Sequence, residues 1–244
     1  MSESSTLPTP PLLGRDLHMT FVDPERTVRT VPVDDVFAGQ EIDNTFVADL
    51  LSDMLAHERC GLHLYRSVAG RTQAPALKRG YEQRGSETRE HIEILETLIA
   101  GLGGQPTYVS PSARATTKVG SSIPEATFLL RGSIDPAAVE LVMLDAVLMA
   151  ETRDRANWDG LAALAEDLTD SAVRERIRLA TNRVADEEDE HVRWATTQRA
   201  KLLRMLAHGV SVDEVDGDGD RVSEGIVDRI RHWFSDDGRP ETDP

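Results

Sequence analysis

Apolar residues recur every three or four positions along four long stretches of this chain, which is the spacing of one face of an α-helix. Val47, Leu51 and Leu55 show this spacing in the first stretch, and Leu95 and Leu98 show it in the second. The pattern predicts helices over residues 44–68, 75–100, 135–168 and 170–207. No comparable alternation of apolar and polar residues indicates strands, so the predicted fold class is all-α.

Glycine, proline and capping residues mark the ends of these helices. Gly70 ends the first helix, and Pro75 suits the first turn of the second. Asp135 and Asp170 each stand just before a helix, where a carboxylate can cap the free backbone N–H groups. Only a few residues separate helix 1 from helix 2 and helix 3 from helix 4, so each pair forms an antiparallel hairpin.

The connection between the two hairpins is much longer. Residues 105–134 contain three prolines and Gly120, so they read as a loop with at most a short helix near residues 126–130. A helix of about 26 residues is roughly 39 Å long, so this link can return along the whole bundle. The predicted architecture is a ferritin-like four-helix bundle with a long crossover between helices 2 and 3.

Composition shifts divide the chain into three expected segments. Residues 1–43 are rich in proline and show no sustained period, which predicts an extended arm before the bundle at 44–208. Residues 209–244 begin as an acidic linker and end in a short amphipathic helix. The acidic run is not a calcium-binding loop, because Arg221 and Val227 stand where such a loop needs glycine and glutamate. The terminal helix is expected to dock on the bundle or on a second copy, so a homodimer is the expected assembly.

Two nearly identical motifs lie one hundred residues apart in helices 2 and 4. They are Glu87-Thr88-Arg89-Glu90-His91 and Glu187-Glu188-Asp189-Glu190-His191. A carboxylate three or four residues before a histidine lies on the same helical face. Helices 1 and 3 add Glu58 and Glu151, single acids that interrupt otherwise apolar faces. Two helices with such motifs and two with single acids form the pattern of a dinuclear metal site.

The positions of these acids along the helices support the same interpretation. The predicted helix midpoints fall near residues 56, 88, 152 and 189, and each helix has a candidate acid within about two residues of its midpoint. Midpoints of antiparallel helices share one height, so the side chains should meet in one layer. The expected metal ligands are Glu58, Glu87, His91, Glu151, Glu188 and His191, with Glu187 and Asp154 as alternatives.

Buried carboxylates need a counter-charge, which favours metal ions in this layer. Four acids in an apolar interior repel one another and lose hydration, at a cost of several kcal/mol per ion. Two divalent ions would compensate this charge, and a set of carboxylates with imidazoles suits iron or manganese better than zinc or calcium. Each acid taken alone could instead lie on a solvated face, and an empty structural bundle is the remaining alternative.

Other residues near the motifs have less specific interpretations. Tyr65 follows Glu58 by seven residues and Trp158 follows Glu151 by seven, so the two aromatic residues occupy equivalent places in the two halves. We expect them to be core residues first, with a redox role as the alternative. His57 and His63 look peripheral to the layer, and Cys60 reads as a small packed residue.

Charge and cysteine content restrict the remaining classes of function. The chain has 43 acidic and 27 basic residues, and a net charge of -16 disfavours nucleic acid and anionic membranes as partners. The single cysteine, Cys60, excludes an internal disulfide or a four-cysteine metal site. No apolar run approaches the roughly 20 residues of a membrane span, and the first residues lack the features of a signal peptide. A soluble cytoplasmic protein is expected.

Several segments together resemble the YciE/YciF-like family of the ferritin-like superfamily. They are Leu51 through Ala56-His57-Glu58-Arg59, Pro75-Ala76-Leu77-Lys78, residues 87–96 and residues 150–161, within a resemblance that covers about residues 45–205. Members of this family are bacterial helical proteins linked to stress and without a settled activity. The resemblance therefore implies a stress-related role.

The second helix departs from the broader ferritin and manganese-catalase pattern, in which histidine follows its glutamate by three residues. Thr88 stands at that place before His91, so the glutamate would be Glu87, at a spacing of four. The fourth helix keeps the spacing of three with Glu188, whereas Glu187 is the repeat equivalent of Glu87. The helix 4 ligand is therefore either Glu187 or Glu188.

These observations lead to two hypotheses about function. The first is a di-iron or di-manganese oxidoreductase that handles dioxygen or peroxide, because two metal ions cycling together can supply two electrons to an O–O bond. The second is a non-catalytic metal-binding or structural stress protein that acts as a scaffold. The sequence assigns no individual catalytic residue.

Overall fold

The computed structural model describes residues 43–129 and 136–208. This part of the chain is helical throughout apart from its turns, and it contains no strand. The helices are α3 (Asn44–Ala69), α4 (Pro75–Gly101), α5 (Pro111–Phe128), α6 (Pro136–Glu166) and α7 (Ser171–Ala207). Apart from Asp43, the predicted N-terminal arm lies outside the described residues, and so do residues 209–244 with their predicted amphipathic helix.

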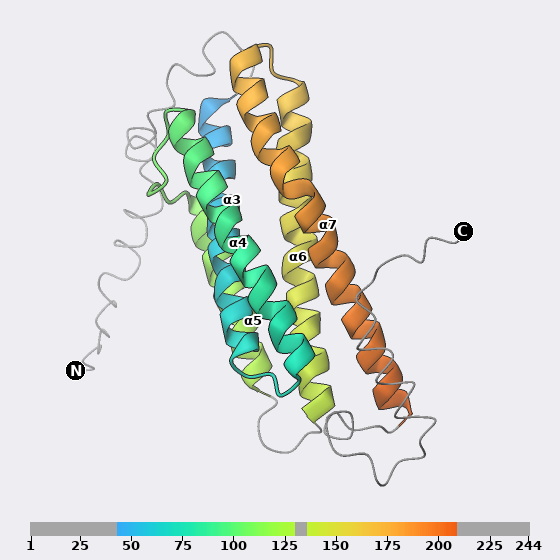
Figure 1. The fold of residues 1–244 in the computed structure, drawn as a ribbon. Helices are drawn as coiled ribbons and strands as arrows, with labels where there is room; N and C mark the ends of the chain where they lie inside the picture. The colour runs from blue at the N-terminus through green and yellow to red at the C-terminus, as the bar shows by residue number, and fades with distance from the viewer. Residues whose placement is uncertain (1–42, 130–135, 209–244) are drawn as a thin grey trace, which may run out of the picture.

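Four of these helices form an elongated bundle made of two antiparallel hairpins (Figure 1). Helices α3 and α4 form one hairpin and α6 and α7 form the other, with α3 packed against α6 and α4 against α7. The predicted all-α, ferritin-like four-helix bundle is confirmed. None of the described helices combines the length and the apolar character needed to cross a lipid bilayer.

Capping residues fix where the helices begin. The Asp43 carboxylate accepts hydrogen bonds from the backbone N–H groups of Thr45 and Phe46 at the start of α3. Asp170 does the same for the first turn of α7, as its position in the sequence predicts. Each such cap typically contributes about 1 kcal/mol to helix stability.

Residues 111–128 of the connection between the hairpins are helical, so the prediction of a loop was wrong for this part of residues 105–134. Helix α5 occupies Pro111–Phe128 and packs on the outside of α3. Ser110 caps it by accepting a hydrogen bond from the backbone N–H of Ala113. Buried Thr116 then hydrogen-bonds Asp53 of α3. These contacts outweigh the helix-breaking tendency of Gly120 and Pro124 within the same segment.

Gly120 lies in α5 because that helix approaches α3 closely. A Cβ atom at this position would lie 2.6 Å from Sγ of Cys60. The glycine that suggested a loop is therefore required for helix packing. Cys60 is half-buried at this contact, and burial raises the pKa of its thiol, in keeping with the packed residue that the sequence predicts.

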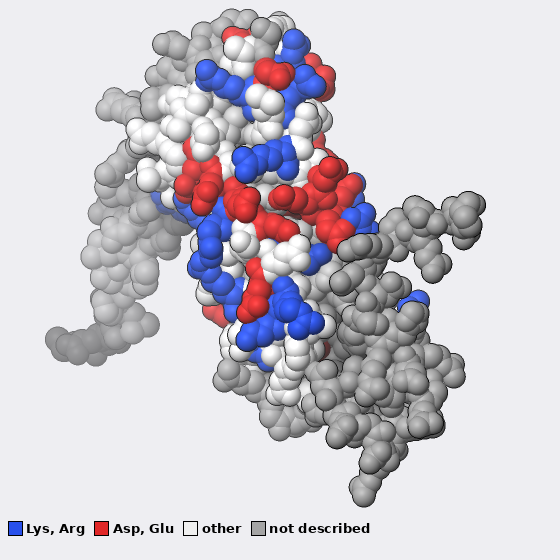
Figure 2. Space-filling view, viewed as in Figure 1, with Lys and Arg blue, Asp and Glu red and all other residues white. Residues whose placement is uncertain are grey.

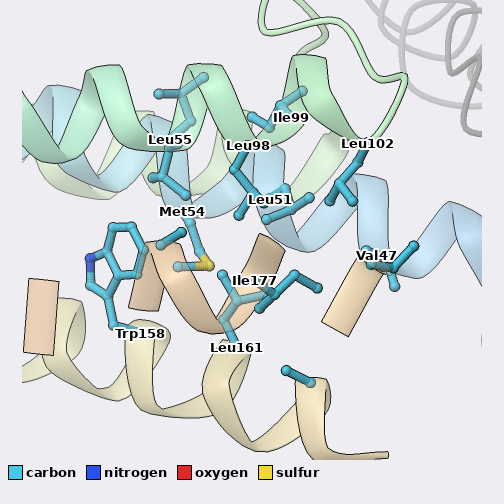
Figure 3. Packing of buried hydrophobic residues seen from close by; sticks show 14 of the residues in the cluster. Val47, Leu51, Met54, Leu55, Leu98, Ile99, Leu102, Trp158, Leu161 and Ile177 are labelled. Atoms are coloured by element: carbon cyan, nitrogen blue, oxygen red, sulfur yellow. The ribbon is translucent and has the colours of Figure 1, made fainter. Parts of the chain in front are cut away.

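Two apolar clusters fill the bundle, one toward each end. The first contains Met54, Leu95, Trp158 and Ile177, and Figure 3 shows side chains from α3, α4, α6 and α7 meeting within it. The second is built from residues such as Tyr65, and it uses the other half of each of these helices. The predicted layer of acids and histidines falls between the two clusters along every helix. Both walls of that layer are therefore apolar.

We predict that Gly80→Ala destabilises the fold, because a Cβ at this position would lie 2.1 Å from Cζ2 of the Trp194 ring. Neither the ring nor the backbone can yield easily, so the expected loss is about 1–3 kcal/mol. Chemical denaturation followed by circular dichroism measures it. Gly160→Ala is the matched control, since a Cβ there meets nothing within 4 Å. The control should gain up to about 1 kcal/mol from helix propensity, and an equal response of the two variants would contradict the prediction.

Candidate metal centre

Four helices bring the predicted acids and histidines into one buried layer. Glu58, His91 and Glu188 form one group and Glu151, Glu188 and His191 form a second, and within each group the nearest ligand atoms lie within 4.8 Å of one another. Glu188 belongs to both groups. Two adjacent sets that share one carboxylate have the arrangement expected of two neighbouring ions with a bridging ligand.

This layer is almost completely closed to solvent. Glu58 and His91 have no exposed surface, and Glu188 and His191 are each 1% exposed. Glu151 and Asp154 are buried as well. The apolar clusters on both sides therefore make this a site of low dielectric constant, where unpaired charge is costly.

The two histidines are held by carboxylates of the opposite helix in a reciprocal pattern. His91 of α4 lies 2.8 Å from Glu187 of α7 through Nε2, and His191 of α7 lies 2.9 Å from Glu87 of α4 through Nε2. The two rings stack, with centroids 5.7 Å apart and planes inclined by 26°. Carboxylates in this position fix the orientation of a histidine that binds metal through its other nitrogen.

The other nitrogen of each ring faces the inner acids. His91 Nδ1 lies 3.0 Å from Glu188 and 3.7 Å from Glu58. His191 Nδ1 lies 2.9 Å from Glu151 and 4.0 Å from Glu188. Both imidazoles thus offer Nδ1 to the space that the carboxylates enclose.

Glu187 and Glu188 take different positions, although the sequence could not choose between them. Glu188 lies inside the layer, whereas the Glu187 side chain is 43% exposed and contacts the outer face of His91. Glu87 is the counterpart of Glu187, because its side chain is 24% exposed and contacts the outer face of His191. Figure 2 shows acidic side chains in a belt across the middle of the face on which α4 and α7 lie.

Aromatic and acidic side chains of α6 complete one side of the layer. Trp158 donates a hydrogen bond from Nε1 to Glu58 at 2.8 Å. Asp154, one turn before Trp158, is 4% exposed and lies among the inner acids. The sequence indicated the place of Trp158 through its equivalence with Tyr65, but not its hydrogen bond to an acid of the other hairpin.

Several polar atoms of the layer have no hydrogen-bond partner within the described residues. They are Oε2 of Glu58, both carboxylate oxygens of Glu188, Oδ1 of Asp154 and Nδ1 of His91. His91 Nδ1 and Glu188 Oε1 lie 3.0 Å apart, but not in the geometry of a hydrogen bond. Buried acceptors are rarely left without a donor or a cation, because each costs about 1–3 kcal/mol when unpaired. Every one of these atoms is a ligand type that iron and manganese accept. The residues present therefore fit a pair of divalent metal ions.

The shifted pKa values of the buried groups also indicate that the layer lacks positive charge. Burial, and then the nearby charges of Asp154 and Glu188, raise the pKa of Glu58 well above its usual value. Burial and the charge of Glu151 raise the pKa of Glu188 to about 8. Burial alone would lower the pKa of His191, but hydrogen bonds with Glu151 and Glu87 raise it to about 10. Without metal, the layer compensates its charge by holding protons.

Two further polar residues are buried near this layer without belonging to either ligand group. His57, predicted to be peripheral, is buried and its Nε2 lies 3.0 Å from the carbonyl oxygen of Ala150, which links α3 to α6. Arg84 is 3% exposed, with its guanidinium 4.2 Å from the Trp194 ring and 3.3 Å from Glu190. Nothing in the sequence separated this buried arginine from the many exposed ones.

Comparison with known proteins agrees with the fold. The family described as Domain of unknown function (DUF892) matches residues 42–197, which is more than half of the chain. The chain therefore belongs to this family, which is the YciE/YciF-like ferritin-like family that the sequence resembles. Neither a curated protein nor a solved structure matches the chain.

We predict that the metal-free protein loses stability as the pH rises from about 5 to about 8. The folded pKa of Glu188, about 8, exceeds its ordinary value of 4.5, so its contribution is complete below pH 4.5 and is lost as the pH rises through 8. The raised pKa of His191, about 10 against 6.5, acts in the same direction at higher pH. Thermal melts in chelator across this range measure the effect.

Glu188→Gln is the control for that experiment, because it removes the titrating carboxyl and should flatten the dependence. Added Mn²⁺ should raise the melting temperature more at pH 8 than at pH 6, since the metal competes with these protons. A melting temperature of the metal-free protein that rises with pH over this range would contradict the assignment.

Proposed function

We propose that this member of the DUF892 family binds two redox-active divalent metal ions, iron or manganese, in the layer between its apolar cores. The observation that carries the proposal is the pair of buried ligand groups that share Glu188. Neither oxygen of that carboxylate makes a hydrogen bond within the described residues, although the side chain is 1% exposed and its Oε1 lies 3.0 Å from His91 Nδ1. A carboxylate in this position could be shared by two ions.

Each ion would then have its own protein ligands in addition to Glu188. Glu58 and His91 would hold one ion, and Glu151 and His191 would hold the other. Asp154 would add a carboxylate from α6. Glu87 and Glu187 would orient the histidines from outside, or join the ligands when their present hydrogen bonds break.

We propose an oxidoreductase that handles peroxide or dioxygen as the activity of this centre. When bound, two metal ions cycling together supply the two electrons that cleave an O–O bond. The residues of the chain provide the surroundings: the apolar clusters exclude bulk water, and Trp158 holds Glu58 by its hydrogen bond. Glu87 and Glu187 lie between the buried imidazoles and solvent, so they can pass protons to and from the layer.

The closed layer also favours a second candidate, a metal-binding scaffold without catalysis. Ligand groups with 0–3% exposure are suited to retaining ions rather than exchanging substrates. The family resemblance gives a stress-related role to either candidate. A cytoplasmic location and a homodimer stay predictions.

We predict that the purified protein holds about two iron or manganese ions per chain, and that Glu188→Gln reduces this content to one ion or fewer. The amide keeps the shape of the side chain but removes the negative charge that two ions share. Elemental analysis of protein purified without chelator measures the content. Glu90→Gln is the matched control, since Glu90 belongs to the same repeated motif but its side chain is 57% exposed. A Glu188→Gln variant with undiminished metal would overturn the proposed centre.

We predict that the metal-loaded protein consumes peroxide. A Glu58→Ala/His191→Ala variant, which removes one ligand from each group, should lose this activity. An oxygen electrode separates disproportionation of peroxide, which releases dioxygen, from reduction by an added donor, which does not. Protein with two ions of either metal and no turnover under both conditions would favour the scaffold. Metal-free protein in the same assay is the baseline.

A further inference from the structure

A surface groove of about 520 Å³ lies between α3 and α4, beside the candidate metal centre. Its wall includes Tyr65 and Tyr81, and its rim carries Arg66, Lys78 and Arg89. This volume is within the usual range for pockets that bind small molecules, about 300–1,000 Å³. The groove is therefore large enough for an aromatic ring with a charged substituent.

The charge of this groove is opposite to that of the chain as a whole. Arg66, Lys78 and Arg89 are all exposed, and none of them pairs with a carboxylate among the described residues. Glu82 is the acid on the groove wall, so the basic residues outnumber it three to one. In a chain with a net charge of -16, unpaired cations around a groove favour an anionic ligand.

The tyrosines connect this groove with the buried layer. The Tyr65 ring lies 6.3 Å from the His191 ring and 6.4 Å from the Tyr81 ring, measured between centroids. The Tyr65 hydroxyl is fully buried and lies near the carboxylate of Glu151, a member of the layer. Gly85 allows α4 to lie close to Tyr65, because a Cβ there would lie 3.2 Å from Cβ of the tyrosine. A single aromatic side chain thus spans the distance from the groove wall to a histidine of the centre.

We propose that this groove binds a small hydroquinone-type electron donor that carries an anionic group. The basic rim would hold the anion, and the ring of the donor would lie over Tyr65 and Tyr81, which are 1% and 0% exposed and so lie beneath the groove surface. Electrons would reach the layer through the Tyr65 and His191 rings. This inference rests on the proposed function, since it supplies the reductant that a peroxide-reducing centre needs.

The reaction balances without any other reactant. The hydroquinone loses two electrons and its two hydroxyl protons and becomes a quinone. One molecule of hydrogen peroxide takes up the two electrons and two protons, its O–O bond breaks, and two molecules of water form. The donor protons leave the groove for solvent, and an equal number enters the layer by way of Glu87 and Glu187. No bond forms between the donor and the protein.

Binding is tested first, on metal-free protein, with hydroquinonesulfonate as the anionic probe and unsubstituted hydroquinone as the neutral one. Calorimetry should show saturable binding of the anionic probe, weakened about tenfold in Arg66→Gln/Lys78→Gln. The control Arg79→Gln/Arg178→Gln removes the same charge from residues outside the groove wall and should leave binding unchanged. Thermal melts check that both variants fold.

Electron delivery is tested second, on protein loaded with ferric iron and mixed with each probe without oxygen. Hydroquinonesulfonate should reduce the iron, and the groove variant should slow this reaction about tenfold at subsaturating probe, in proportion to the lost binding. The same variant should not change the rate with neutral hydroquinone. Loss of the ferric absorbance reports the reaction without any peroxide turnover.

Absence of saturable binding, or equal weakening in both double variants, would overturn the groove as a binding site. Binding displaced equally well by inorganic phosphate, with no effect of the groove variant on iron reduction, would overturn the electron-donor role and leave an anion site only. Failure of the chain to hold metal would instead refute the proposed function, and elemental analysis detects that separately. The binding result still decides whether the groove is a ligand site in that case.

Discussion

The structure depends on burying a layer of carboxylates between two apolar cores. Glu58, Glu151, Asp154 and Glu188 come from three helices and lie where water cannot hydrate them. Such a layer is compatible with a stable fold only if protons or cations compensate its charge. The reciprocal hydrogen bonds of the histidines, the shared position of Glu188 and the raised pKa values all follow from that requirement. Metal binding in this layer would therefore be coupled to the stability of the bundle.

The two hairpins are related by an approximate internal repeat, and the repeat fails at one position inside the layer. The outer glutamates and the histidines recur one hundred residues apart and make equivalent contacts. Thr88, however, stands at the place of Glu188, and its hydroxyl donates to the carbonyl oxygen of Arg84 instead of offering a carboxylate. The carboxylates are consequently divided unevenly between the halves, and α6 adds Asp154. Two ions in this layer would have unequal surroundings, unlike those of a symmetric centre.

Spacing in the sequence was enough to predict the four bundle helices and the height of the layer, because helix periodicity and short hairpin loops leave little freedom. It did not reveal α5, since Gly120 and Pro124 break helices unless packing requires them, and Gly120 meets Cys60 in the partner helix. The sequence also could not decide whether Glu187 or Glu188 is the inner residue of the fourth helix. Neighbouring residues of a helix are turned by 100°, so one of the two lies inside and the other at the surface. Which of them lies inside depends on how α7 is oriented about its own axis in the packed bundle.

Two kinds of side chain lie between the closed layer and the protein surface, on different faces of the bundle. On the side of α4 and α7, Glu87 and Glu187 extend from the histidines to the surface, and carboxylates can pass cations and protons. On the side of α3 and α4, Tyr65 fills the corresponding space with an aromatic ring, which is the proposed route for electrons. A centre buried for stability can in this way exchange charge without opening. The separation also keeps a donor away from the acidic belt, whose field would repel an anion.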